Sequence, residues 1–218
     1  MLRPPQMLRP KTGLEPEAVR RVVEALRRGA LVLLPTDTVY GIAADPRVPG
    51  AEARLAAAKG RPRTRPIPFL AAGRADVERC GAEFDATARR LADAFWPGPV
   101  TLVLSCGDKF EGFRVPACAP TVDVLRASGG VLRVTSANRS GEPPALTAEE
   151  AVRALGDSVE VALDGGPASG SVPSTVVKVE NGTARILREG AVGRREIEAA
   201  VSGRGNAAGG ASARETAG

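Results

Sequence analysis

Four apolar residues near the start of the chain repeat at the three- and four-residue spacing of a helix: Val19, Val22, Val23 and Leu26. Pro16 suits the first turn of such a helix and Gly29 can end it, so we expect a helix between them. The residues that follow, 31–34, are all apolar. Such a run is typical of a strand that is covered on both faces.

Helices and strands continue to alternate along the chain. Further helices are predicted over 51–58, 85–95, 120–128 and, after a capping box formed by Thr147 and Glu150, through Leu155. Further strands are predicted over 100–104, 131–134, 159–163, 175–179 and 183–187. Asn181-Gly182 between the last two strands is a strong hairpin signal. Together these elements predict an α/β fold with a mixed sheet.

The two ends of the chain differ in composition from the rest. Residues 1–12 are rich in Pro and Arg and 203–218 are rich in Gly, Ala and Ser, so we expect a flexible N-terminal segment and a disordered tail. The stretch 13–202 has no linker-like break, which predicts one domain. No apolar run approaches the roughly 20 residues that cross a bilayer, and the N-terminus lacks the pattern of a signal peptide. We therefore expect a cytoplasmic protein without a membrane partner.

Composition narrows the possible chemistry. The chain contains no histidine, which excludes Ser-His-Asp triads, Cys-His dyads and HExxH zinc sites. The three cysteines, Cys80, Cys106 and Cys118, include no CxxC pair, so neither a disulfide framework nor a zinc site is indicated. The net charge of +5 favours an anionic partner, and a phosphorylated small molecule and a nucleic acid both fit.

The strongest local signal is the basic segment 59–66, which reads KGRPRTRP. Four cations fall within seven residues with no acid among them, and the prolines favour an extended chain whose alternate side chains share a face. Charge runs are usually solvated loops, but here the prolines and the apolar stretch 67–72 favour an anion-binding role. The P-loop pattern GxxxxGK[ST] is missing.

Three further polar segments follow or interrupt predicted strands, where α/β proteins place their sites. The segment 35–41 (PTDTVYG), taken alone, is more simply a capped turn. The segment 135–141 (TSANRSG) suits a nucleotide or a plain turn equally well. In the late segment, the hydroxyls of Ser174 and Thr175 lead a strand, and Arg188 closes one as a candidate clamp for phosphate or carboxylate.

In their order along the chain, these segments resemble the YrdC-like family, the threonylcarbamoyl-AMP synthases. The matching stretches are PTDTVYGIAADP (35–46), KGRPRTRPIPFL (59–70), FWPGPVTLVL (95–104), TSANRSGEPPALTAEE (135–150), LDGGP (163–167), PSTVVKV (173–179) and ILREGAV (186–192). The resemblance implies a twisted mixed parallel and antiparallel sheet, flanked by helices, around a basic cleft. We expect the single-domain form of the family, because only a tail follows residue 202.

The resemblance implies the synthesis of L-threonylcarbamoyl-AMP from L-threonine, bicarbonate and ATP, with release of pyrophosphate. The product would pass to a threonylcarbamoyl-transferase complex that modifies tRNA, and tRNA itself is a further candidate partner. This chemistry suits a chain without histidine, because carbamylated threonine is already anionic and attacks the α-phosphate without a general base. The enzyme would supply positioning and charge stabilisation, with Mg²⁺ bound through ATP and not by protein ligands.

The resemblance also implies roles for individual residues. Lys59 and Arg61 would be catalytic and would bind the ATP phosphates. The other ATP-binding residues would be Arg65, Ser136, Asn138, Pro144 and Arg188. Threonine would be bound by Thr38, Arg114 and Ser174, with Arg114 taking its carboxylate. The chain departs from residues that are common in the family at Pro173 and Lys178, and it lacks a histidine after Arg114-Val115-Pro116.

Two other interpretations are open. A double-stranded RNA- or tRNA-binding module of the same fold, without this activity, also suits a basic chain, and its binding would fall steeply with salt. Aromatic residues make up only 3% of the chain, which argues against stacking on single strands. A carbamoyl-transferring role like that of hydrogenase-maturation relatives is less favoured, because those proteins carry this module within a much longer chain with zinc-finger segments.

Overall fold

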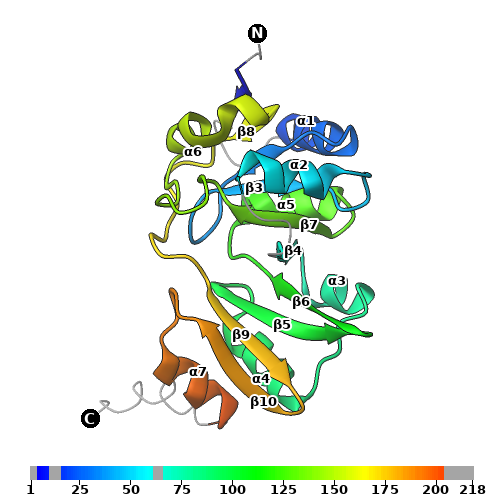
Figure 1. Cartoon of the computed structure of the whole chain (residues 1–218), viewed down its shortest axis with the longest axis vertical. Coiled ribbons are helices and arrows are strands. Elements are labelled where there is room, and N and C mark those ends of the chain that lie inside the picture. Colours follow the sequence, from blue (N-terminus) through cyan, green and yellow to red (C-terminus); the bar gives the residue numbers. More distant parts are fainter. Residues whose placement is uncertain (1–3, 10–15, 61–65, 204–218) are drawn as a thin grey trace, which may run out of the picture.

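A computed structural model describes residues 4–9, 16–60 and 66–203 of the chain. Its strands form one continuous sheet in the order β1-β8-β2-β3-β7-β4-β6-β5-β9-β10. The pairs β1·β8, β2·β8, β4·β6 and β5·β9 are parallel and the other pairs are antiparallel. Figure 1 shows the sheet running along the length of the molecule, with β8 near one end and the β9–β10 hairpin near the other. The mixed sheet predicted from the sequence is confirmed.

The elements are short. The strands are β1 (Gln6–Leu8), β2 (Val32–Leu34), β3 (Gly41–Ala44), β4 (Phe69–Ala71), β5 (Val100–Cys106), β6 (Lys109–Arg114), β7 (Val131–Ser136), β8 (Val161–Leu163), β9 (Thr175–Glu180) and β10 (Thr183–Arg188). The helices are α1 (Pro16–Arg27), α2 (Ala51–Ala58), α3 (Arg74–Arg79), α4 (Ala86–Phe95), α5 (Ala119–Ala127), α6 (Ala148–Leu155) and α7 (Arg194–Val201), with a 3₁₀ turn (Gly156–Ser158) after α6. None of the described helices is long and apolar enough to cross a membrane.

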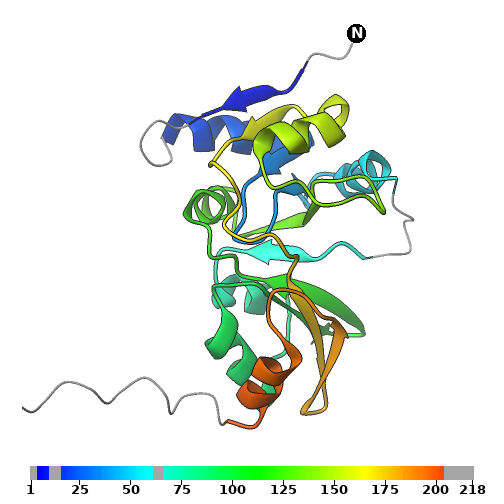
Figure 2. The same cartoon turned by 90° about the vertical axis from the view of Figure 1, so that its left-hand side faces the viewer.

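One half of the sheet, made of β1, β8, β2, β3 and β7, is covered on both faces. Successive residues of β2 point to opposite sides. Leu33 packs with α2 and α6, whereas Val32 and Leu34 pack with α1 and α5. Figure 2 shows these two pairs of helices on opposite sides of the strands. Coverage on both faces explains why every residue of β2 is apolar.

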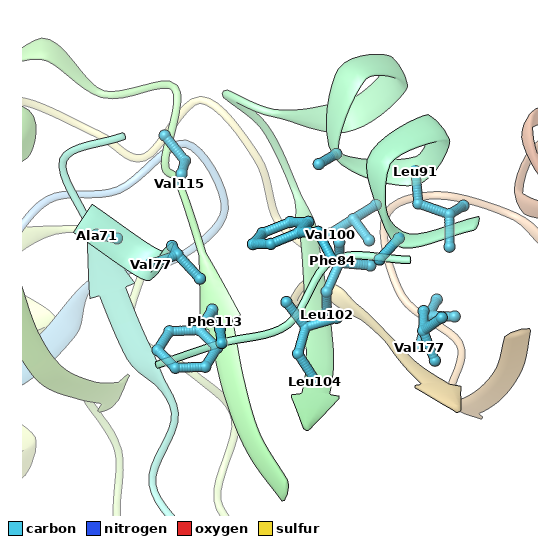
Figure 3. Close-up of a cluster of buried hydrophobic side chains, with 14 of the residues drawn as sticks. Ala71, Val77, Phe84, Leu91, Val100, Leu102, Leu104, Phe113, Val115 and Val177 are labelled. Atoms are coloured by element: carbon cyan, nitrogen blue, oxygen red, sulfur yellow. The ribbon is translucent and has the colours of Figure 1, made fainter. Parts of the chain in front are cut away.

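The other half, made of β4, β6, β5, β9 and β10, packs its helices against one face. The core there contains Val77 of α3, Leu91 of α4 and Ile197 of α7. From the strands, Leu102 and Phe113 point into the same cluster (Figure 3). Alternate residues of β5 and β6 therefore point to the opposite face of the sheet, where they line a cavity.

A β-bulge in β10 redirects one charged side chain. The antiparallel pairing with β9 is regular as far as Ile186↔Val177, and the next pair is Arg188↔Val176. Leu187 is the extra residue, so the alternation between the two faces is interrupted there. As a result Leu187 and Arg188 both line the cavity, although neighbours in a regular strand point to opposite sides.

Most of the elements predicted from the sequence are confirmed. The first helix begins at Pro16, and Gly29, with a φ of 80°, follows its end. The last two strands form the predicted hairpin, and Asn181 and Gly182 in its turn have φ values of 51° and 77°. Except for Gly203, the tail expected from residue 203 onward lies outside the described residues.

The sequence patterns did not predict β3, β4, β6, α3 or α7. Two of the sequence-based expectations also differ from the structure. Within the segment 1–12, for which we expected a flexible chain, Gln6–Leu8 forms a strand, because its backbone groups pair in parallel with β8. In the capping box, Oγ1 of Thr147 accepts from the backbone N–H of Glu150 at 3.2 Å. The Glu150 carboxylate, however, accepts from the N–H of Leu146 at 2.7 Å and not from that of Thr147.

Two phenylalanines on opposite faces of β6 give a matched test of this core. Phe113 is fully buried and stacks on Phe69 with 5.3 Å between ring centroids, whereas Phe110 is 37% exposed. We expect Phe113→Ala to lower the free energy of unfolding by about 3–5 kcal/mol, because it leaves a cavity in the core. Phe110→Ala should lower it by less than about 1 kcal/mol. Urea unfolding measures both, and equal losses would contradict the assignment of faces.

Candidate functional site

A cavity of about 390 Å³ lies where the open face of the second half of the sheet meets β3, β7 and the loop after β2. Its volume is within the size range of small-molecule sites. Five residues that the sequence singled out line it: Thr38, Arg114, Ser136, Ser174 and Arg188. They come from the loop after β2, from the ends of β6, β7 and β10, and from the residue before β9. The described lining contains two arginines and neither Asp nor Glu, which suits an anionic ligand.

The hydroxyl of Thr36 holds the loop after β2. Its Oγ1 accepts from the backbone N–H groups of Thr38 at 3.1 Å and Val39 at 3.2 Å, and it donates to the carbonyl of Val39 at 2.6 Å. This is the capped turn that the sequence favoured. The turn also presents the hydroxyl of Thr38 to Arg114, so the segment serves both local structure and the site.

Arg114 is a buried arginine with three acceptors. Nε donates to the carbonyl of Gly98 at 3.0 Å, and Nη1 donates to Oγ1 of Thr38 at 2.9 Å. Nη2 donates to Oδ1 of Asp37 at 2.5 Å. Burial lowers the pKa of Arg114, and the Asp37 carboxylate opposes that shift. A guanidinium has five N–H groups, so one on each Nη has no acceptor in the described chain, and Arg114 lines the cavity.

Lys59 connects the end of α2 to the loop after β7. Its Nζ donates to the carbonyl of Ser136 at 2.5 Å, to Oγ of Ser136 at 3.2 Å and to Oδ1 of Asn138 at 3.1 Å. The side-chain amide of Asn138 donates to two backbone carbonyls of its own loop, at 2.7 and 2.8 Å, which fixes the loop. Two segments that the sequence marked separately, 59–66 and 135–141, are therefore in direct contact.

Arg188 brings a positive charge whose partners in the described part of the chain are all neutral. Its Nη2 donates to the carbonyl of Ser174 at 2.6 Å and to Oγ of Ser174 at 3.4 Å. Partial burial lowers the pKa of Arg188, and no carboxylate of the described chain pairs with it to oppose that shift. A partly desolvated cation is stabilised by a nearby anion, so this part of the cavity also favours an anionic group.

A close approach of Gly190 fixes the backbone at Ser174. A Cβ atom on residue 190 would lie 2.2 Å from the carbonyl oxygen of Pro173 and 2.6 Å from the carbonyl carbon of Ser174, so only glycine fits. The backbone N–H of Ala191 then donates to the carbonyl of Pro173 at 3.0 Å. These contacts hold Pro173 in place through its carbonyl, and they position Ser174 at the start of β9.

Five predicted site residues are not placed in the cavity wall. Lys59 and Asn138 do not line the cavity, although Lys59 donates to Ser136, which does. Pro144 lies in the loop before α6 and does not line the cavity either. Arg61 and Arg65 lie outside the described residues. The roles assigned to all the predicted site residues, including those that line the cavity, stay predictions.

Two residues that the sequence did not single out belong to the site. Asp37 was seen only as part of a capped turn, yet its carboxylate is the counter-charge of Arg114. Thr101 is enclosed in the apolar strand VTLVL, and its Oγ1 lies 2.9 Å from Oγ of Ser174. The signal that would have found Thr101 is the alternation of β5, which places it on the open face.

A second cavity, of about 650 Å³, lies on the other side of the sheet between α4 and α5. It is lined largely by apolar residues such as Trp96 and Val115, and Arg74 and Asp93 at its rim pair with each other at 2.8 Å. No predicted site residue lines this second cavity. Over residues 4–9, 16–60 and 66–203, no group of three or more cysteine, aspartate or glutamate side chains is placed to hold a metal ion.

Comparison with known proteins gives the family. The family model for Sua5, YciO and YrdC, described as telomere recombination, matches residues 24–190, which is most of the chain. The chain belongs to this family. The resemblance drawn from the sequence motifs is thereby confirmed.

Named relatives of this Sua5/YciO/YrdC chain cover most of its length. A protein of Mycobacterium tuberculosis (strain ATCC 25618 / H37Rv), provisionally named a threonylcarbamoyl-AMP synthase, is 40% identical over 185 residues, or 80% of this chain and 85% of that protein. The threonylcarbamoyl-AMP synthase of Bacillus subtilis (strain 168) is 31% identical over 194 residues, or 84% of this chain. The match covers only 56% of the longer B. subtilis protein.

Solved structures of the family confirm the fold. P. abyssi Sua5 complexed with L-threonine matches with a TM-score of 0.83 at 30% identity, over 89% of this chain and 60% of that one. E. coli YciO matches with a TM-score of 0.76 at 23% identity, over 85% of this chain and 95% of that one. The α/β fold with a mixed sheet is thus the YrdC-like fold that the sequence predicted.

Tyr40, the only tyrosine, reports on the integrity of the cavity wall. Its hydroxyl donates to the carbonyl of Gly166 at 2.6 Å and accepts from the N–H of Gly165 at 3.2 Å. Burial raises the pKa of Tyr40 far above its ordinary value of about 10. The neutral form is therefore favoured in the folded state, and its stabilising effect is lost as pH rises above about 10 toward the folded pKa.

We expect native protein to show no tyrosinate absorbance as pH passes through about 10, with the signal appearing only as the protein unfolds. Protein unfolded in urea is the control and should titrate near pH 10. An ultraviolet titration measures both, and a native titration that coincides with the unfolded one would contradict the burial of Tyr40.

Proposed function

We propose that this protein synthesises L-threonylcarbamoyl-AMP from L-threonine, bicarbonate and ATP, with release of pyrophosphate. The observation that carries the proposal is a cavity that offers two different arginine sites for anions. Among the described residues, two N–H groups of Arg114 have no acceptor and the positive charge of Arg188 has no carboxylate partner. Membership of the family, the names of the relatives and the threonine complex of P. abyssi Sua5 support the same reaction.

Threonine would bind at the Arg114 end of the cavity. Its carboxylate would accept from Nη1 and Nη2 of Arg114 in the bidentate geometry that a guanidinium favours. Asp37 and Thr38 already hold the guanidinium in one orientation, so little side-chain freedom would be lost on binding. Ser174, on the same cavity wall, would donate to the bound substrate.

The ATP phosphates would lie between Arg188 and the contact of Lys59 with Ser136. Lys59 donates to both oxygens of Ser136, which lines the cavity, so the ammonium is close to the space that a phosphate would occupy. Lys59 and Arg61 would carry the catalytic charge. The further ATP contacts of the proposal are Arg65, Ser136, Asn138, Pro144 and Arg188.

In the reaction, an oxygen of the carbamylated amine would attack the α-phosphate of ATP. A new P–O bond forms, the bond from the α-phosphate to the bridging oxygen breaks, and pyrophosphate leaves with the electron pair. The attacking oxygen is already anionic, so no side chain has to remove a proton. The work left to the protein is to align the two substrates and to stabilise the charge that moves onto pyrophosphate, which suits a site built from Lys and Arg.

Mg²⁺ would enter this site with ATP. The described lining offers no carboxylate to a cation, so phosphate oxygens and water would hold the ion. When bound, it supplies neutralisation of the phosphate charge. The adenylate would then pass to a threonylcarbamoyl-transferase complex for modification of tRNA in the cytoplasm.

The proposal is tested by incubating the purified full chain with Mg²⁺, ATP, bicarbonate and each amino acid in turn, and analysing the products by mass spectrometry. The expected product is threonylcarbamoyl-AMP, formed with L-threonine and only when bicarbonate is present. A different preferred amino acid would revise the substrate. A chain that forms no such adenylate, but binds double-stranded RNA or tRNA with steep salt dependence, would be the RNA-binding module instead.

Substitution of the two proposed catalytic residues gives a second test. We expect Lys59→Ala and Arg61→Ala each to lower threonine-dependent pyrophosphate release by at least about 10²-fold, because each would remove a charge that the proposal assigns to the ATP phosphates. Lys109→Ala is the control, since it removes an exposed lysine that pairs with Glu111. A coupled pyrophosphate assay measures release and thermal unfolding confirms folding. Wild-type-like release from both variants would refute the assignment.

A further inference from the structure

Thr101 is a polar residue in the cavity wall to which the proposed reaction gives no role. In β5, Val100 and Leu102 point into the core, so Thr101 between them points to the open face. Thr101 is only 4% exposed. Its Oγ1 lies 2.9 Å from Oγ of Ser174, which is its only side-chain partner in the described chain.

The hydrogens of this hydroxyl pair follow from the donors around them. Oγ of Ser174 lies 3.4 Å from Nη2 of Arg188, and a guanidinium can only donate. Both residues line the cavity, but Thr101 is the less exposed of the two, at 4% against 8% for Ser174. If Ser174 donated to Thr101, the hydrogen to be satisfied would be the less accessible one, and it has no acceptor in the described chain, which is costly. If Thr101 donates instead, Ser174 accepts two hydrogen bonds, and both of its lone pairs are used.

When Thr101 donates to Ser174, the hydroxyl hydrogen of Ser174 is the only hydrogen of the two hydroxyl groups that still lacks an acceptor among the described residues. Ser174 lines the cavity, so its hydrogen can point into that space. A hydroxyl whose lone pairs are both occupied can only donate to a ligand. It therefore favours a ligand that presents an acceptor, and an anionic oxygen is the strongest acceptor.

We propose that Thr101 is a positioning residue that makes the hydroxyl of Ser174 a hydrogen-bond donor to the carboxylate of the amino-acid substrate. This inference rests on the proposed function, which supplies the carboxylate. Leu102 pairs with Phe113, so Thr101 lies opposite Arg114 on the same face of the sheet. Thr101 thus bonds to Ser174 and lies opposite Arg114. Ser174 and Arg114 are the two residues that would hold one carboxylate.

The decisive variant is Thr101→Val, because valine keeps the branched shape of threonine and removes the hydroxyl. Without that donor, Ser174 regains a free lone pair and its hydrogen loses its fixed direction. We expect the Kd of L-threonine in calorimetry, and its KM in pyrophosphate release, to rise about three- to tenfold. The kcat and the KM for ATP should change by less than about twofold, because the contact to the carboxylate is the same in the ground state and in the transition state.

Two further variants separate this role from packing. Thr101→Ser restores the hydroxyl and should return the Kd to within about twofold of wild type. Thr87→Val is the matched control, since Thr87 is also buried and donates to the carbonyl of Gly182 at 2.8 Å, but lies on α4 outside the cavity. If Thr101→Val does not fold, Thr101→Ala and Thr101→Ser, which differ by the hydroxyl alone, give the same comparison.

A folded Thr101→Val with the wild-type Kd would overturn the inference, as would failure of Thr101→Ser to restore it or an equal change in Thr87→Val. A wild-type chain that binds L-threonine without releasing pyrophosphate would overturn the proposed function alone, and the dissociation constants would still decide the role of Thr101. A wild-type chain that binds no L-threonine would overturn both.

Discussion

The burial of one positive charge, on Arg114, is the constraint on which the site depends. A guanidinium that is removed from water needs hydrogen-bond acceptors and a counter-charge, or its burial destabilises the fold. The acceptors come from Asp37 and Thr38, in the loop after β2, and from the backbone of Gly98, in the corner before β5. Because these groups belong to the two halves of the sheet, satisfying Arg114 also fixes how the halves meet. The cavity lies at that junction.

The two arginines of the cavity differ in how fully they are satisfied. Arg114 already has a carboxylate partner and is held rigidly, so it discriminates by geometry more than by charge. Within residues 4–9, 16–60 and 66–203, Arg188 bonds only to the neutral oxygens of Ser174, so it attracts negative charge of any shape. A site that joins a small carboxylate to a polyphosphate needs both kinds of recognition. Ser174 accepts from Arg188 and lies within hydrogen-bond distance of Thr101, which is opposite Arg114. Ser174 therefore lies between the two arginines.

Local sequence patterns predicted much of the fold, because helical spacing and the Asn181-Gly182 turn act within a few residues. The site was only partly predictable, since its decisive contacts join distant segments. Nothing in the sequence pairs Lys59 with Ser136, which meet only after α2 packs on the sheet. Thr101 was not predicted as a site residue, because its neighbours in the strand are all apolar. The bulge at Leu187 has no periodic signature, yet without it the last arginine of β10 would point away from the cavity.

The register of β9 with β10 limits which changes in the length of the hairpin turn the cavity can tolerate. Loop tips normally tolerate insertions and deletions, and the hairpin turn at Asn181-Gly182 is far along the strands from the site. A change in turn length that slipped the pairing by one residue would exchange the two faces of β10. Ile186 would then leave the core, and the charge of Arg188 would be carried out of the cavity. The length of this hairpin turn therefore decides whether the positive charge of Arg188 lies in the cavity, although the turn itself is distant from it.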